Sequence, residues 1–102
     1  MAMQLTKPSD CNSKDEIRNQ IDLIDNEILQ LFATRFQYVE EIVKYKTDEE
    51  SVIAFDRKME VISNRGELAE KLGLDRATYE LIYKIIIENN ISKELKILEN
   101  SK

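Results

Sequence analysis

Hydrophobic residues recur at helical spacing along most of the chain, and the longest such stretch runs from Ser13 to about Lys46. This stretch contains neither glycine nor proline, and its apolar residues follow the alternating steps of four and three that keep side chains on one face of a helix. The members of that face are Ile17, Ile21, Ile24, Ile28, Leu31, Tyr38, Ile42 and Tyr45. Ser13 and Glu16 have the S-x-x-E spacing of a capping box, which marks a helix start. The pattern predicts one helix over residues 13–46.

The rest of the chain predicts two further helices. Residues 47–54 interrupt the periodicity and mix charged with β-branched residues, so we expect a mobile loop or a frayed helix end there. A second helix is expected from Phe55 to Leu72, and its apolar face consists of Phe55, Met59, Ile62, Ala69 and Leu72. Gly66 lies within this helix and is expected to weaken it, whereas Gly73 directly follows it and suits a C-terminal cap.

A third helix is expected after Asp75, a favourable N-cap residue, with an apolar face of Tyr79, Tyr83, Ile87, Ile91 and Leu98. The predicted fold class is therefore all-α, with three helices of which the first is very long. We divide the chain into an irregular lead-in at residues 1–12, one helical domain at residues 13–98 and a solvated tail at residues 99–102. A helix over residues 13–46 would be roughly 50 Å long, whereas a chain of 102 residues folds alone into a body about 26 Å across. We therefore expect a partner chain to cover the first helix.

Three charged residues occupy positions on these apolar faces. Arg35 fills a place in the register of the first helix, and Lys46 lies eleven residues later, which returns it to nearly the same face at about 100° per residue. Glu94 interrupts the face of the third helix. Burying an unpaired charge is costly, and three arrangements avoid that cost. The two cations can form a site for an anion, or Glu94 can pair with one of them in a structural ion pair. Alternatively, the long side chains can reach out to water. The sequence leaves these alternatives open.

Two further arginines have simpler explanations. Arg18 and Arg57 each lie among other charged residues and are compatible with ordinary surface positions. Arg18 is about 100° away from Arg35 around an ideal helix, so the two could not hold one ligand from the same helix. They could do so if Arg18 came from a partner chain.

Composition narrows the chemistry. The chain has no histidine and one cysteine, which removes the commonest general base and metal ligand and supports neither a zinc site nor a Cys–His nucleophile. A net charge of −5 argues against general nucleic-acid binding. No apolar run approaches the roughly 20 residues that cross a bilayer, and the first ten residues lack the apolar core of a signal peptide. The lone Cys11 fits a reducing cytoplasm, so we expect a cytoplasmic protein without a metal centre and without a membrane or nucleic-acid partner.

The sequence resembles the all-helical chorismate mutase family. The similar stretches are PSDCNSKDEIRNQIDLIDNEI, RFQYVEEIVKYK, FDRKMEVI and ELAEKLGLD, and the match covers about residues 7–98. Within the family, the resemblance is strongest to the isochorismate-pyruvate lyase branch, which forms salicylate for siderophores. Its most specific features are P-x-D-C before I-R-x-x-I-D-x-I-D, and the Y-V…K spacing after Arg35.

The resemblance implies an intertwined homodimer with two equivalent sites, each built from both chains, and a reaction that needs no metal or organic cofactor. The implied catalytic residues are Lys46, at the ether oxygen and carboxylate of the enolpyruvyl group, and Glu94. The implied substrate-binding residues are Arg18 from the partner chain, Arg35 as a carboxylate clamp, Arg57 closing over the substrate, and Ile91. Residues 47–54 correspond to a mobile lid.

Two positions depart from the family pattern. Glu94 stands where a glutamine commonly faces the ether oxygen, which an ionised carboxylate would repel and a protonated one could donate to. Lys58 stands where typical mutases have a glutamate that contacts the substrate hydroxyl, and this favours the lyase. The resemblance therefore implies an isochorismate-pyruvate lyase with weak chorismate mutase activity. The alternatives are a chorismate mutase that makes prephenate, and a non-catalytic helical dimer that only recruits a partner.

Overall fold

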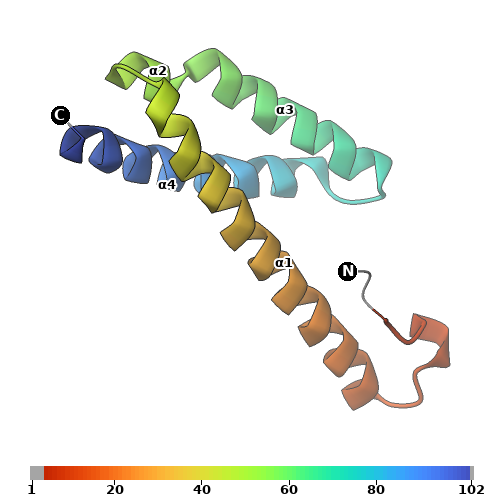
Figure 1. Ribbon diagram of the computed structural model, residues 1–102. Helices are drawn as coiled ribbons and strands as arrows, with labels where there is room; N and C mark the ends of the chain where they lie inside the picture. The colour runs from red at the N-terminus through yellow and green to blue at the C-terminus, as the bar shows by residue number, and fades with distance from the viewer. Residues whose placement is uncertain (1–3, 102) are drawn as a thin grey trace. The chain divides into compact units, whose positions relative to one another are not determined.

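The computed structural model describes residues 4–101, and these residues form helices joined by short connections (Figure 1). In chain order the elements are the 3-10 turn η1 Pro8–Asp10, α1 Lys14–Ile42, the 3-10 turn η2 Val43–Tyr45, α2 Glu49–Ile53, α3 Phe55–Lys71 and α4 Arg76–Asn100. Residues 4–101 contain no strand, so the predicted all-α class with a long N-terminal helix is confirmed. The expectations for residues 1–3 and 102 lie outside the described residues.

The chain forms two compact units, of which the first ends at Phe36 and the second begins at Gln37. None of the helices in residues 4–101 is both long enough and apolar enough to cross a membrane.

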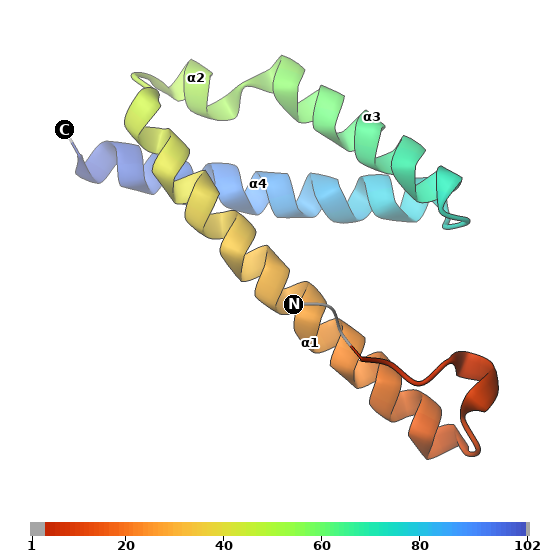
Figure 2. The same cartoon turned by 45° about the vertical axis from the view of Figure 1, so that its right-hand side comes forward.

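In the first unit, the lead-in is tied to the beginning of α1. The Ser13 hydroxyl accepts a hydrogen bond from the Glu16 backbone N–H at 3.1 Å, which fixes the predicted helix start. The Glu16 carboxylate accepts from the backbone N–H of Asn12 at 2.6 Å, one residue earlier than in a standard capping box. The Thr6 N–H donates to the side-chain oxygen of Gln20 at 2.9 Å, so the lead-in runs back along the first turns of α1 (Figure 2).

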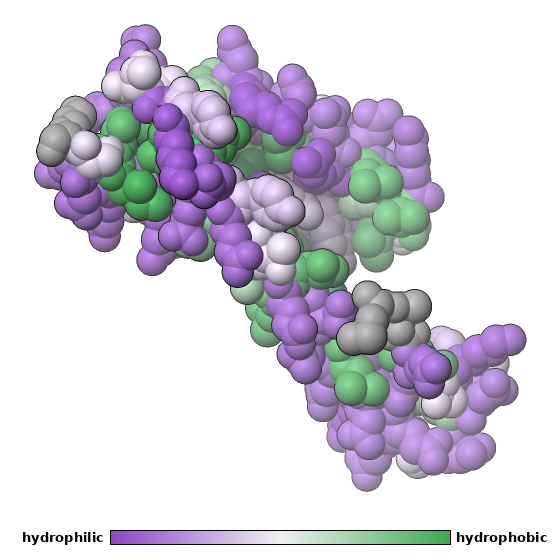
Figure 3. All heavy atoms as spheres, in the orientation of Figure 1, coloured by the Kyte–Doolittle hydropathy of each residue, from purple (hydrophilic) through white to green (hydrophobic). Residues whose placement is uncertain are grey.

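The apolar residues of α1 remain at the surface. No residue of this helix is buried, and Figure 3 shows hydrophobic residues among hydrophilic ones along it. The exposed apolar residues of α1 are Ile17, Ile21, Leu23, Ile28, Leu29, Leu31, Tyr38 and Ile42. An apolar stripe of this length on a helix is typical of a surface that another chain covers.

In the second unit, α1 ends at Ile42 rather than at Lys46. The chain tightens into the 3-10 turn η2, and Lys46 follows with extended backbone angles of φ −109° and ψ 137°. Lys46 therefore lies beyond α1, so the predicted helical face shared by Arg35 and Lys46 does not form. The turn has a tertiary cause, since it buries Val43 in one cluster with Val52 and Leu98.

Residues 47–54 were expected to be a loop or a frayed helix end, and their central part instead forms the separate short helix α2. Asp48 caps this helix, since its carboxylate accepts from the Ser51 backbone N–H at 2.8 Å, while the Ser51 hydroxyl accepts from the Asp48 N–H at 3.3 Å. The fully buried residue of α2 is Val52. Ala54 then adopts a left-handed conformation with φ 42°, and α3 begins at the next residue.

The cap of α2 leads to a pH-dependent stability prediction. Hydrogen bonds from the Ser51 backbone and side chain lower the pKa of Asp48 below its usual value. A lowered pKa in the folded state contributes stability above the unfolded pKa of about 4, and this contribution is lost as the pH falls through the folded value. Urea unfolding should therefore show Asp48→Ala to be less stable than wild type at pH 6, with a smaller difference at pH 3. Glu49→Ala, which removes an exposed carboxylate that caps nothing, is the control and should show no such convergence.

Helices α3 and α4 lie side by side in both ribbon views (Figures 1 and 2). The buried residues of α3 are Val61, Ile62, Gly66 and Ala69. Gly66 was expected only to weaken α3, but it also allows α4 to approach closely, because a Cβ there would lie 2.4 Å from Cγ of Glu80 on α4. Phe55, Met59 and Leu72, which were expected on the buried face, are exposed. Phe55 and Leu72 stand at the two ends of α3, and Met59 lies one turn after Phe55.

The ends of these helices follow the sequence signals. Gly73 has φ 81°, its N–H bonds to the Glu70 carbonyl at 3.0 Å, and the Leu74 N–H bonds to the Ala69 carbonyl at 2.9 Å. These are the two bonds of a Schellman cap. Asp75 caps α4 by accepting from the Thr78 N–H at 3.0 Å, as predicted. Helix α4 continues to Asn100, so residues 99 and 100 are helical rather than part of a tail.

Candidate active site

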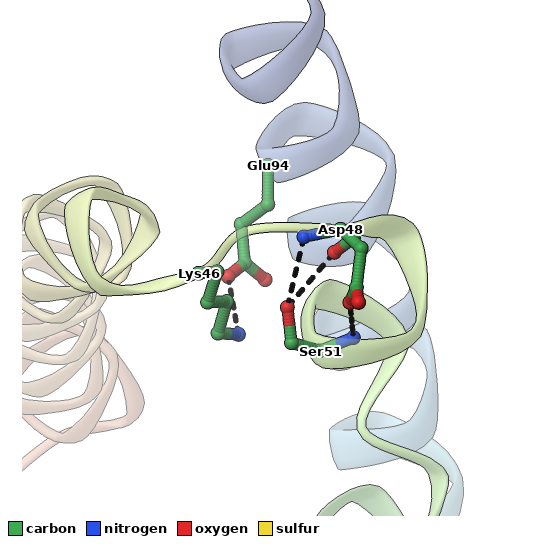
Figure 4. A network of polar contacts seen from close by, with 4 residues as sticks. All are labelled: Lys46, Asp48, Ser51 and Glu94. Atoms are coloured by element: carbon green, nitrogen blue, oxygen red, sulfur yellow. Dashed lines mark hydrogen bonds and ion pairs between the residues drawn. The ribbon is translucent and has the colours of Figure 1, made fainter.

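Lys46 and Glu94, the two predicted catalytic residues, meet in the second unit. The Lys46 Nζ lies 2.9 Å from Oε1 of Glu94, and the two side chains are only 17% and 7% exposed. Figure 4 shows Glu94 extending from α4 toward Lys46, which lies in the segment between η2 and α2. The sequence allowed Glu94 to pair with Arg35 or with Lys46, and the structure has the pair with Lys46.

The local sequence explains how this pair forms. The buried residues of α4 are Asn90, Glu94 and Leu98, which recur every four residues and so share one face. Leu98 packs in the cluster that contains Val43, and Lys46 follows Val43 by three residues. The apolar contact between Val43 and Leu98 therefore brings the two charged residues together. Without a partner, either charge would be costly at this depth.

Asn90 is a further candidate for the site that the sequence interpretation did not include. It is buried, and it lies one turn before Glu94 on the same face of α4. Its amide offers both a donor and an acceptor one turn before Glu94 on α4. The signal was present as the spacing of four residues from Glu94, but a polar residue on a helix gives no indication of burial until the neighbouring elements are placed.

Ile91 and Arg57 have different surroundings. Ile91 is partly buried and packs against the cluster of Val43, Val52 and Leu98. Arg57 is exposed and forms an ion pair with Glu60 one turn later in α3. The Arg57 side chain also borders a surface hollow at the turn from α2 to α3, whose lining residues are Glu50, Ile53, Ala54, Phe55, Asp56 and Arg57. Neither Lys46 nor Glu94 lines this hollow.

Arg18 and Arg35 belong to the first unit. Arg18 is exposed and Arg35 is partly buried. Within residues 4–101, neither guanidinium has a hydrogen bond or an ion pair, so both arginines can accept an anion without breaking an existing contact. A planar guanidinium holds a carboxylate through two parallel hydrogen bonds.

The groups of the second unit can bind and stabilise negative charge. Within the described part of the chain, no three carboxylate or thiol side chains come together as a metal site. Lys46 supplies an ammonium group that is largely shielded from water, where its interaction with an anionic oxygen is stronger than at the surface. Glu94 supplies a carboxyl group that accepts hydrogen bonds when ionised and donates one when protonated.

Comparison with known proteins identifies relatives of this chain. A model of the family "Chorismate mutase type II" matches residues 17–95. A protein of Pseudomonas aeruginosa named "Isochorismate pyruvate lyase" is 33% identical over 89 residues, which cover 87% of this chain and 88% of that protein. The matched region of the family model includes every candidate site residue.

Proposed function

The chain belongs to the chorismate mutase type II family, and from this premise we propose that it is an isochorismate pyruvate lyase that converts isochorismate to salicylate and pyruvate. Weak chorismate mutase activity in the same site is part of the proposal. The observation that carries it is the shielded Lys46–Glu94 pair, because it holds an ammonium group where an anionic oxygen can bind. The name of the P. aeruginosa relative supports the choice of the lyase reaction.

The proposed reaction balances without a nucleophile, a metal or an organic cofactor. The ether C–O bond breaks, the enolpyruvyl oxygen becomes the ketone of pyruvate, and one ring hydrogen passes to the methylene carbon to make the methyl group. The ring becomes aromatic at the same time. Negative charge develops on the ether oxygen as its bond breaks, so an ammonium group placed there lowers the barrier. Lys46 has this role, and Arg18, Arg35 and Arg57 hold the two substrate carboxylates in the reactive conformation.

We further propose that the protein acts as a homodimer in the cytoplasm, with each site shared between chains. The exposed apolar stripe of α1 supports the dimer, because a second α1 of the same chemistry can cover it. The only ligand in the proposal is a small dianion, held by local cations in a chain whose net charge is −5. The proposal includes neither a nucleic-acid nor a membrane partner.

A side-by-side assay with isochorismate and chorismate tests the activity. The purified protein should release salicylate from isochorismate with a much higher kcat/KM than it forms prephenate from chorismate. The opposite ratio would make it a chorismate mutase, the candidate that the family match itself favours. A ligand that binds only the folded state must stabilise it, so malate or salicylate should raise the melting temperature of an enzyme of this kind. Inactivity with both substrates and no such rise would favour the non-catalytic helical dimer that only recruits a partner.

Glu94→Gln tests what the side chain at this position offers the ether oxygen. An ionised carboxylate only accepts hydrogen bonds and repels that oxygen, whereas a glutamine amide donates a hydrogen bond and carries no charge. We therefore expect Glu94→Gln to keep or raise kcat/KM for isochorismate relative to the wild type. Steady-state kinetics of the two proteins at the same pH measures the change. A large loss of activity in Glu94→Gln would show that the carboxyl group itself is required.

A further inference from the structure

The first turn of α3 is held weakly by its own residues. Its N-cap position is occupied by Ala54, which has no side chain that can cap the helix. Phe55 and Met59 are 63% and 47% exposed, so apolar packing also contributes little at this end. The ion pair of Arg57 with Glu60 joins two residues of α3 and does not connect the turn to another element.

One polar contact within the described chain ties this turn to α4. The Lys58 Nζ lies 3.2 Å from Oε1 of Glu88, and the two side chains are 18% and 48% exposed. The Lys58 side chain is therefore almost as withdrawn from water as that of Lys46, although it lies in a turn whose other side chains are largely exposed. A lysine held in this way loses side-chain entropy, which the contact with Glu88 must offset.

Arg57 immediately precedes Lys58 and projects from the same turn. The position of this turn determines where the exposed Arg57 guanidinium can reach at the hollow formed with Glu50, Ile53 and Phe55. We propose that Lys58 is a positioning residue: its ion pair with Glu88 holds the first turn of α3 against α4, so that Arg57 is correctly placed to close on the substrate. This inference rests on the proposed substrate-binding role of Arg57.

The expected signature is a change in substrate binding with little change in global stability. Glu88 is half exposed, so solvent screens the pair, and such pairs contribute little to stability. Displacing Arg57 weakens the hold on a carboxylate in the bound substrate, which raises KM more than it lowers kcat. Lys58→Met should raise KM for isochorismate roughly threefold to tenfold, and Lys58→Glu should raise it further because it places like charges together.

Charge exchange and a double-mutant cycle test the inference. Lys58→Glu/Glu88→Lys should recover a KM near that of the wild type, because the pair is restored with its charges reversed. In an Arg57→Ala background, Lys58→Met should cause little further change, since the effect of Lys58 passes through Arg57. Lys71→Met is the matched control, because Lys71 and Glu67 form a surface pair on the same helix. It should leave KM unchanged.

Each other outcome overturns the inference. If Lys58→Met and Glu88→Gln both keep the wild-type KM, Lys58 does not position Arg57. If Lys58→Met raises KM equally in the Arg57→Ala background, Lys58 acts independently of Arg57. A wild type that is inactive with both isochorismate and chorismate overturns the proposed function and this inference together. An active wild type with an unchanged Lys58→Met variant overturns only this inference, so the two failures are distinguishable.

Discussion

Lys46→Ala is expected to lower kcat/KM for isochorismate by about 10²–10³-fold, the range observed when one preorganised charge-stabilising group is removed. The ammonium group of Lys46 is held at a shielded position by Glu94, so little reorganisation precedes its interaction with the ether oxygen. Water that replaces the side chain would solvate the developing charge less effectively. Steady-state kinetics with isochorismate measures the loss directly.

The design of this experiment must separate catalysis from folding. Removing Lys46 leaves the Glu94 carboxylate nearly buried without its partner, which destabilises the fold. Glu94→Gln/Lys46→Ala removes both charges, so its stability should lie closer to that of the wild type. If this double variant is folded and inactive while Glu94→Gln alone is active, the loss belongs to the chemistry of Lys46. Full activity of Lys46→Ala would remove Lys46 from the mechanism, and a double variant that fails to fold would support a structural ion pair.

The local signals in the sequence predicted the helix ends that depend on neighbouring residues. Ser13, Gly73 and Asp75 each act through hydrogen bonds to residues at most four positions away. Such signals can therefore be recognised in the sequence before the tertiary structure is known. The end of α1 is different. Nothing in the residues near Ile42 requires a helix end, and the chain turns there because Val43 packs with Val52 and Leu98.

The same distinction applies to the site. The misplaced charges Lys46 and Glu94 were visible because each interrupts an apolar pattern, but the two are 48 residues apart in the chain. The pairing of Glu94 with Lys46 depends on the turn at η2. A continuous helix up to Lys46, as the sequence pattern predicted, does not contain that turn. The family resemblance predicted both as site residues without helical geometry, since it relies on matched positions.

Mixing two inactive variants should restore activity if each site takes Arg18 from one chain and Lys46 from the other. Arg18→Ala and Lys46→Ala each inactivate both sites of their own homodimer. A mixed dimer, however, has one site that carries both substitutions and one site that carries neither. Random assembly of equal amounts gives mixed dimers in about half of the molecules, each with one intact site, so the mixture should regain about a quarter of the wild-type activity.

Co-expression of differently tagged variants allows the mixed dimer to be purified, and its kcat per dimer should be about half that of the wild type with an unchanged KM. Mixing Arg35→Ala with Lys46→Ala is the control, because the proposal places both residues in the same chain's contribution to a site. That mixed dimer should recover no activity, because one of its sites carries Arg35→Ala and the other carries Lys46→Ala. A second test combines a double variant with a wild-type chain. The mixed dimer of Arg18→Ala/Lys46→Ala with wild type should have two damaged sites. The mixed dimer of Arg35→Ala/Lys46→Ala with wild type should keep one intact site. Equal activity of these two mixed dimers would show that Arg18 is not donated across the interface.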